Sequence, residues 1–164
     1  MQDYLKWIRV AGIGMLTGMA LGGYWAGHKY CLKLIESRAL EDKHLNMVRL
    51  YDAWMMTKQR GASVSEYLTN HDIHTVAIYG MSYMGIRLFH DLKDSSVQVK
   101  YGIDRELKMR IPGIMTYHPD EVQEKEVDAV IVTAIFSFDF IKKDLRALGF
   151  KRIVALDEIL YDLM

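Results

Sequence analysis

The chain has 164 residues, of which 51% are apolar, and its 21 basic side chains are balanced by 21 acidic ones. This length allows one domain of ordinary size and an accessory segment, and the apolar content excludes global disorder. The absence of a basic segment argues against nucleic acid as the main partner. Cys31 is the single cysteine, so an intrachain disulfide is excluded. The six histidines are scattered and show no zinc-type spacing, so we expect no structural metal site.

The first 27 residues differ from the rest of the chain. Residues 10–26, VAGIGMLTGMALGGYWA, carry no charge, and as a helix they would span about 26 Å. Extension back to Trp7 brings this length close to that of a bilayer core, with Tyr24 and Trp25 as an aromatic belt at the other end. We therefore predict residues 1–27 to be a membrane-anchor helix in contact with lipid. The alternatives are a cleaved signal peptide and a buried or interfacial helix.

Glycines recur every four residues in this segment, at Gly14, Gly18 and Gly22. Such small-residue stripes let membrane helices approach closely, so we predict a homo-oligomer formed through them. Basic residues are slightly more numerous after the segment than before it, with Lys29, Lys33 and Arg38 against Lys6 and Arg9. The positive-inside rule then predicts a single-pass protein of the cell membrane whose domain lies in the cytoplasm.

Residues 28–73 are predicted to be a helical connector. Residues 28–60 lack Gly and Pro, and Met47, Tyr51 and Trp54 recur at helical spacing. Gly61 is expected to end the helix, and a capping box that starts at Ser63 is expected to begin a short second helix. The connector either packs against the following domain, which we favour, or forms an oligomerising stalk.

Residues 74–164 alternate between strand and helix patterns. Strands are expected at residues 76–79, 97–103, 114–116, 127–134 and 153–156. Helices are expected after residue 80, at 118–121, and from a Ser137 cap to Gly149 with Phe138, Ile141, Leu145 and Leu148 facing inward. The nearly continuous apolar run VDAVIVTA is typical of a central parallel strand. This order predicts a three-layer α/β domain with a Rossmann-like parallel sheet flanked by helices.

The loop after the first strand is the candidate ligand site. It reads Gly80-Met81-Ser82-Tyr-Met-Gly85, in which a serine stands where dinucleotide-binding loops have their middle glycine. The helix N-terminus behind it suits a phosphate, because its backbone N–H groups are free. Asp104 ends the second strand at about the spacing from Gly80 that ribose recognition requires, and Thr133 follows the central strand. The alternative is that the glycines serve only the geometry of the chain.

No catalytic constellation is evident in the sequence. There is no Tyr-x-x-x-Lys pair and no G-x-S-x-G elbow, and none of the histidines has an identifiable partner. The catalytic residues therefore stay unassigned, and no metal ligand is predicted.

The stretches VAIYGMSYMGIRLFHDLKDSSVQVKYGIDRE, IPGIMTYHPDEV, VDAVIVTAIFSFDFIKKDL and RIVALDEIL resemble the Rossmann-like domains of bacterial capsule and exopolysaccharide biosynthesis proteins. Similar domains form the N-terminal part of nucleotide-sugar acetyltransferases and the C-terminal part of some sugar C-methyltransferases. The resemblance covers about residues 45–162 and implies a nucleotide or nucleotide-sugar site at Gly80, Ser82, Gly85 and Asp104. The hexapeptide-repeat and methyl-donor domains of those enzymes have no counterpart in this sequence.

Together these observations predict a membrane-anchored nucleotide- or nucleotide-sugar-binding protein that works beside partner enzymes of bacterial surface-polysaccharide biosynthesis. It would present or sense their substrate. A ligand-free membrane scaffold is the first alternative. A small NAD(P)-dependent sugar-modifying enzyme is the second and is less favoured, because the sheet is half-size and the middle glycine is missing.

Overall fold

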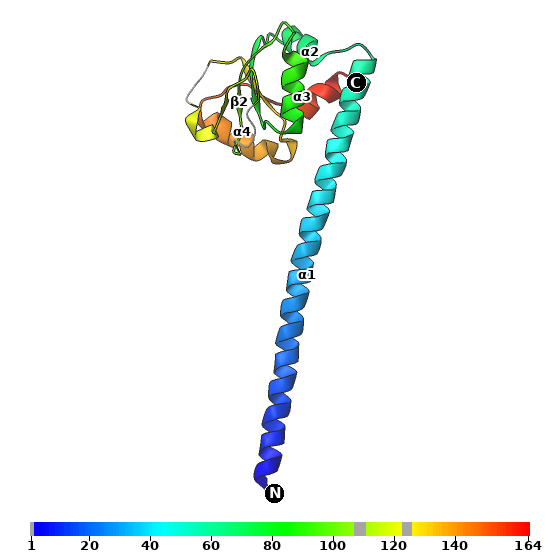
Figure 1. The fold of residues 1–164 in the computed structure, drawn as a ribbon, viewed down its shortest axis with the longest axis vertical. Coiled ribbons are helices and arrows are strands. Elements are labelled where there is room, and N and C mark those ends of the chain that lie inside the picture. Colours follow the sequence, from blue (N-terminus) through cyan, green and yellow to red (C-terminus); the bar gives the residue numbers. More distant parts are fainter. Residues whose placement is uncertain (1, 107–110, 123–125) are drawn as a thin grey trace. The chain divides into compact units, whose positions relative to one another are not determined.

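A computed structural model describes residues 2–106, 111–122 and 126–164, and Figure 1 shows the ribbon coloured along the sequence. Contacts divide the chain into two compact units, residues 1–47 and 48–164, and each is considered by itself. The helices are α1 (Gln2–Gln59), α2 (Val64–Asn70), α3 (Tyr83–Leu92), α4 (Phe138–Ala147) and α5 (Leu156–Asp162). The strands are β1 (Thr75–Tyr79), β2 (Gln98–Ile103), β3 (Thr116–Tyr117), β4 (Ala129–Val132) and β5 (Ile153–Ala155). Two 3-10 turns, η1 (Pro119–Glu121) and η2 (Ile135–Ser137), complete the order.

The five strands form one sheet in the order β3-β2-β1-β4-β5, and all its pairings are parallel. This is the Rossmann-like arrangement in its general sense, as the alternation of strands and helices predicted. The strand order reverses between β1 and β4, so the carboxyl ends of these two strands flank the topological switch point. In such sheets ligands bind at this place.

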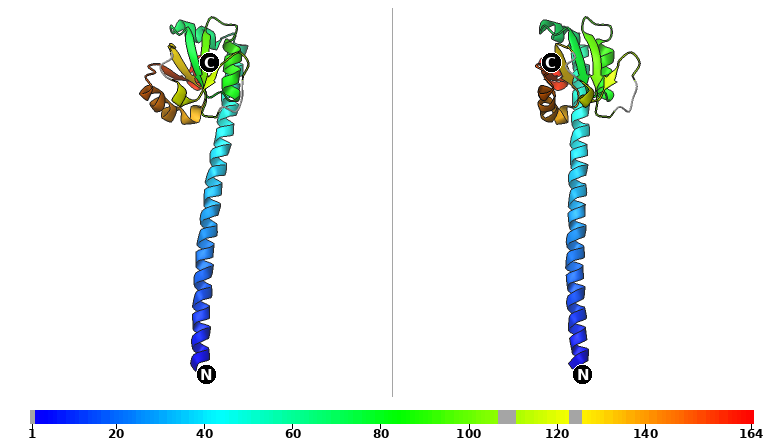
Figure 2. Two further views of the ribbon diagram at one scale, coloured as in Figure 1. Left: turned by 60° about the vertical axis from the view of Figure 1, so that its left-hand side comes forward. Right: turned by 90° about the vertical axis from the view of Figure 1, so that its left-hand side faces the viewer.

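Helices cover both faces of the sheet, with α3 and α4 on opposite sides (Figure 2). On the α4 side, the strand residues Ala77, Tyr101 and Val130 are buried with Ile141 and Leu145 of the helix. Alternate strand residues such as Ile78 point to the other face, where the α3 backbone approaches at Gly85. The three-layer expectation is therefore confirmed.

The helix α1 runs through the boundary between the two units. Its first part, residues 2–47, belongs to the first unit, and its last turns belong to the α/β unit, where Leu50, Ala53 and Trp54 are buried. Gly14, Gly18 and Gly22 fall in the part of α1 for which only the backbone is described. The expected membrane-spanning helix is not found: within the described residues, no helix combines the required length with sufficient hydropathy. Glycine contributes little hydropathy, and residues 10–27 contain six glycines.

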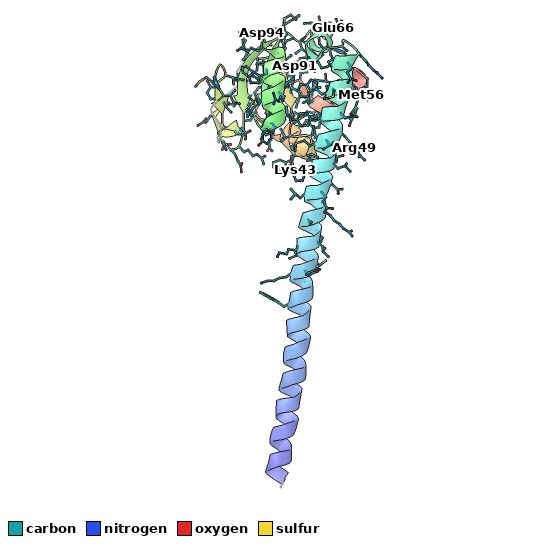
Figure 3. All side chains as sticks on the ribbon, turned by 45° about the vertical axis from the view of Figure 1, so that its right-hand side comes forward. Lys43, Arg49, Met56, Glu66, Asp91 and Asp94 are labelled. Atoms are coloured by element: carbon teal, nitrogen blue, oxygen red, sulfur yellow. The ribbon has the colours of Figure 1, made fainter. Side chains whose placement is uncertain are left out.

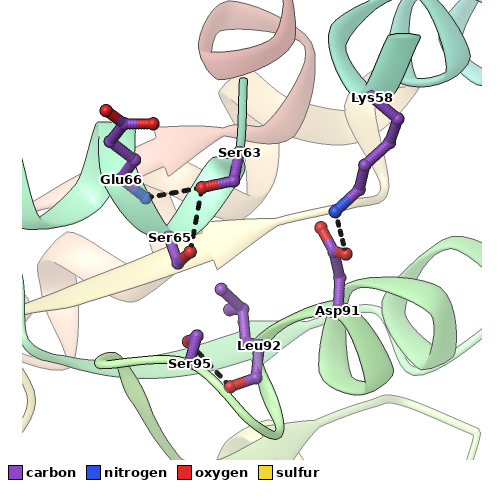
Figure 4. A network of polar contacts seen from close by, with 7 residues as sticks. All are labelled: Lys58, Ser63, Ser65, Glu66, Asp91, Leu92 and Ser95. Carbon is purple, nitrogen blue, oxygen red and sulfur yellow. Dashed lines mark hydrogen bonds and ion pairs between the residues drawn. The ribbon is translucent and has the colours of Figure 1, made fainter. Parts of the chain in front are cut away.

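The connection between α1 and the sheet follows the predicted capping signals. Gly61 adopts a left-handed backbone with a φ of 75°, two residues after the last residue of α1. The Ser63 hydroxyl then accepts a hydrogen bond from the Glu66 amide and begins α2. Lys58 in the last turn of α1 forms an ion pair with Asp91 of α3, which is labelled in Figure 3, and Figure 4 shows the pair from close by. The end of α1 is thereby attached to the helix that carries the candidate loop.

Several predicted boundaries are wrong in detail. The helix α4 begins after a 3-10 turn, and the Ser137 side chain makes no capping hydrogen bond. Leu148 was expected to face inward but is 37% exposed, because the helix ends before it. The last strand stops at Ala155, and Leu156 opens an additional helix, α5, whose residues Leu156, Ile159 and Leu160 are buried. The third strand is displaced to Thr116 and Tyr117.

Asp128 joins the starts of β1 and β4. Its Oδ2 atom accepts hydrogen bonds from the backbone amides of His74 at 2.9 Å and Thr75 at 2.7 Å. In return, the Thr75 hydroxyl accepts the Asp128 amide at 3.0 Å. The hydrogen bonds from the His74 and Thr75 amides hold the pKa of the Asp128 carboxyl below its ordinary value of 3.8.

Replacement of Asp128 by Ala should lower the free energy of unfolding by about 1 kcal/mol at neutral pH, since the carboxylate is largely exposed and solvent weakens its hydrogen bonds. The folded-state pKa is lowered, so this contribution is complete above pH 3.8 and disappears as the pH falls through the folded-state value. Urea unfolding at neutral pH and at a pH below the folded-state pKa measures this contribution to the free energy of unfolding. The exposed Asp94 provides the control Asp94→Ala, which should unfold like the wild type, and an equal loss in both variants would refute the assignment.

Candidate functional site

The ends of β1 and β4 are joined directly at the switch point. The Thr133 amide donates to the Tyr79 carbonyl at 2.9 Å, which continues the strand pairing by one residue. The Thr133 hydroxyl donates to the Gly80 carbonyl at 2.6 Å and lies 3.2 Å from the Tyr79 carbonyl. Thr133 is buried, so its side chain fixes the position at which the loop leaves β1. Thr133 therefore lies beside the loop, after the central strand.

Both glycines of the loop are required by close approaches. Gly80 has a φ of 95°, and a Cβ atom there would lie 2.8 Å from the Thr133 hydroxyl. Gly85 lies in the first turn of α3, where a Cβ atom would come within 2.1 Å of the Gly80 carbonyl oxygen. Since real Cβ atoms do not approach other atoms so closely, Gly85 sets the distance between the helix and β1. This is the packing role that the third glycine has in dinucleotide-binding loops.

Asp104 extends from the end of β2 to the loop. Its Oδ2 atom accepts the Met81 amide at 2.6 Å, and its Oδ1 atom accepts the Glu106 amide at 2.8 Å. The Asp104 amide donates to the Tyr117 carbonyl at 3.0 Å, which ties the same residue to β3. Asp104 therefore joins the ends of β1, β2 and β3, and its carboxylate places negative charge beside the N-terminus of α3.

The Met81 side chain does not point to solvent. It is buried, and it covers Gly102 of β2, where a Cβ atom would lie 2.7 Å from Cγ and 2.9 Å from Sδ of Met81. The backbone amide of Met81 thus belongs to the site, whereas its side chain belongs to the core. Gly102 was not singled out in the sequence, because a glycine inside a strand has no distinctive pattern until its neighbour is known.

Ser82 is an exposed residue of the loop. It is the N-cap residue of α3, its backbone is extended, and its side chain makes no capping hydrogen bond. Tyr83, which follows it, is also exposed. The first backbone N–H groups of a helix have no partner within the helix, so this end of α3 presents donors beside a serine hydroxyl.

The structure thus brings all the predicted site residues to the carboxyl edge of the sheet: Gly80, Met81, Ser82, Gly85, Asp104 and Thr133. Two hydrogen bonds connect them, one from Met81 to Asp104 and one from Thr133 to Gly80. Only Ser82 has a side chain whose polar atom is both exposed and without a capping hydrogen bond.

The side chains of Arg105 and Tyr79 also lie at this edge, and neither was identified as a candidate from the sequence. Arg105 directly follows Asp104, and its Nη2 atom donates to Asp144 Oδ2 of α4 at 3.3 Å. Its guanidinium also lies 5.0 Å from the Phe140 ring centre. Burial raises the pKa of the Tyr79 phenol, and the nearby Arg105 opposes part of that rise. The sequence signal that could have identified Arg105 is its position directly after Asp104, at the end of β2.

Neither protein-family models nor curated proteins match this sequence. The resemblance to capsule and exopolysaccharide proteins therefore rests on the residue pattern, and the fold supports it only to the level of a Rossmann-like parallel sheet. The assignment of a ligand depends on the geometry of the loop and of Asp104.

Replacement of Gly85 by Ala tests the packing of the loop. In a helix this exchange normally stabilises by about 1 kcal/mol. Here we expect a loss of about 1–3 kcal/mol instead, because the new methyl group meets the Gly80 carbonyl oxygen. Thermal unfolding followed by circular dichroism measures the change. An unchanged or higher melting temperature would show that α3 is free to move away from β1.

Proposed function

We propose that the α/β unit binds a nucleotide or a nucleotide sugar at the carboxyl edge of its sheet. The observation that carries this proposal is the meeting of the loop, Asp104 and Thr133 at the topological switch point. Ligands of doubly wound sheets bind there because the helices on either side diverge and leave a crevice. The loop supplies backbone donors at this crevice, and β2 supplies an acid.

The phosphates of such a ligand would lie at the N-terminus of α3. The first-turn N–H groups and the positive end of the helix dipole attract an anion, and the exposed Ser82 hydroxyl adds a donor. A phosphate would approach the loop at Ser82 and Tyr83. The amide of Met81 is taken by Asp104, whose charge would repel a phosphate placed deeper in the loop.

The ribose would lie over Asp104. Each carboxylate oxygen has two lone pairs, and in the structure each accepts one backbone hydrogen bond, so each retains capacity for a hydroxyl group. Arg105 lies beside this position and offers a guanidinium to a second phosphate, in exchange for its exposed ion pair with Asp144. The site would thus hold the nucleotide part of its ligand and leave the sugar outside the loop.

The resemblance described from the sequence favours a nucleotide or nucleotide sugar and a role beside polysaccharide-biosynthesis enzymes. No catalytic group is assigned, because the polar side chains of the predicted site are a threonine engaged with backbone, a serine and an acid that supports the loop. Binding, in order to present or sense a substrate, is the function that this set of residues supports best.

A pair of substitutions at Ser82 separates phosphate binding from helix stability. Serine, asparagine and aspartate are equally good N-cap residues, so Ser82→Asn and Ser82→Asp should both keep the fold. Aspartate places a negative charge where the phosphate would lie and should weaken binding of UDP and UDP-sugars at least tenfold, whereas asparagine should change it only a few-fold. Calorimetry on the full chain measures both. If the two variants bound UDP with equal affinity, the phosphate would not lie at this loop.

The same panel, extended to CDP, NAD and NADP, identifies the ligand class. Asp104→Ala should weaken binding of any ribose-containing ligand by about tenfold, since two hydroxyl hydrogen bonds are lost. The variant also frees the Met81 amide, so its melting temperature is measured alongside, and Asp94→Ala serves as the matched control at an exposed acid. NADP binding with hydride transfer would favour an oxidoreductase over a binding module.

A ligand-free interaction module is the second candidate, and one observation favours it. Both loop glycines have a steric reason for being glycine, and Asp104 already holds a loop amide, so the loop is self-consistent without a ligand. Failure of the whole nucleotide panel to bind the folded full chain would select this reading.

A further inference from the structure

The opposite, amino-terminal edge of the sheet holds a cavity of about 560 Å³. Residues at or just before the starts of β1, β4 and β5 line it together with one residue of β2. Those that carry polar groups are Thr75, Lys100, Glu126, Asp128, Lys151 and Arg152. A cavity of this volume is in the range of small-molecule sites. It lies at the other end of the strands from the loop at residues 80–85 and shares no residue with it.

Three cations converge on this cavity from two separate segments. Lys100 comes from β2, whereas Lys151 and Arg152 come from the connection between α4 and β5. Among the described residues, none of the three side chains forms an ion pair or a hydrogen bond, although the charge of Arg152 also acts on the Tyr67 phenol, where it opposes part of the rise in pKa. The Arg152 carbonyl accepts the Val130 amide at 2.9 Å, so its backbone is fixed beside β4. The negative end of the α4 helix dipole gives a structural reason for Lys151 and Arg152, which follow this helix, but not for Lys100, which lies in β2.

The acids of the cavity only partly balance this charge. The Asp128 carboxylate is held by the His74 and Thr75 amides and serves the start of β1. Glu126 is exposed and remains as the acid that can respond to a ligand. Three cations against two carboxylates leave a formal charge of +1, and the acid that is fixed to the backbone cannot turn to meet the cations.

A bulge in β2 places Lys100 at the cavity. Val76 pairs with Val99, but the next residue, Ala77, pairs with Tyr101, so Lys100 is the extra residue of the strand. Neighbouring residues of β1 point to opposite faces, and therefore Val99 and Tyr101 also do so, with Lys100 between them. Bulges are rare in parallel pairs and frequent beside functional sites, where they redirect a side chain.

We propose that this cavity binds a small phosphorylated molecule, with its phosphate or diphosphate group held by Lys100, Lys151 and Arg152. Lysine ammonium groups neutralise phosphate as point charges, and an arginine fork adds two parallel hydrogen bonds. The largely buried Phe150 and the half-buried Val127 give the same cavity an apolar wall for the rest of the molecule. This site is independent of the proposed nucleotide site at the opposite edge.

The test uses inorganic phosphate and pyrophosphate with the full chain, followed by calorimetry and by amide chemical shifts. Pyrophosphate should bind more tightly than phosphate, and binding should shift the amide of Gly149, which lines the cavity, and leave those of Gly80 and Ser82 unchanged. Shifts at Gly80 and Ser82 alone would overturn the proposal and would instead favour the carboxyl-edge site. The two hypotheses therefore fail separately.

Lys100→Gln and Arg152→Gln should each weaken pyrophosphate binding by about tenfold, the loss of one charge-assisted contact. Arg152→Lys should recover part of the affinity, because it restores the charge without the fork. Lys143 lies exposed on α4 away from the cavity, so Lys143→Gln should bind like the wild type. The assignment would be overturned if pyrophosphate showed no saturable binding. It would also be overturned if Lys143→Gln and Lys100→Gln lost equal affinity, because anions would then be attracted by surface charge in general.

Discussion

The carbonyl group of Gly80 is the point at which β1, β4 and α3 meet. The Thr133 hydroxyl from the end of β4 donates to its oxygen at 2.6 Å, and the α3 backbone passes the same oxygen so closely that only a glycine is accommodated at residue 85. One peptide group thus fixes how far the helix stands from the sheet and where the chain turns at the switch point. Everything the candidate site offers at this edge, including the direction of the α3 N-terminus, depends on that contact.

Asp104 gives this edge a mixed character. A carboxylate that accepts the Met81 amide stabilises the turn, yet it also brings negative charge to a helix end that would otherwise attract anions. The consequence is a division within the loop: its inner part, at Met81, is suited to hydroxyl groups, and its outer part, at Ser82, is suited to phosphate. At the opposite edge of the sheet, the side chains of Lys100, Lys151 and Arg152 form no ion pair with an acid within the described part of the chain.

The alternation of strands and helices and the positions of the loop residues could be predicted from the sequence because they follow from local patterns. Gly80, Gly85 and the acid after β2 mark the site through spacing alone. What could not be predicted depends on contacts between distant residues. Gly102 matters only because Met81 covers it, and Arg105 matters only because α4 brings Asp144 and Phe140 beside it. Leu156 was assigned to a strand because its apolar pattern continues from β5, whereas burial of Ile159 and Leu160 makes the same stretch a helix. The expected membrane span is not found among the described residues.

The bulge at Lys100 also bears on how the sheet assembles. If β2 paired with β1 without it, the register would continue from Val99 to Lys100, and Lys100 would lie opposite Ala77 within the apolar cluster under α4. An ammonium group in that cluster would lose its water without gaining a partner, which costs several kcal/mol. The charge of Lys100 therefore disfavours the pairing of β1 and β2 without the bulge. The bulge thus keeps the charge of Lys100 out of the apolar cluster under α4 and seats Tyr101 in it.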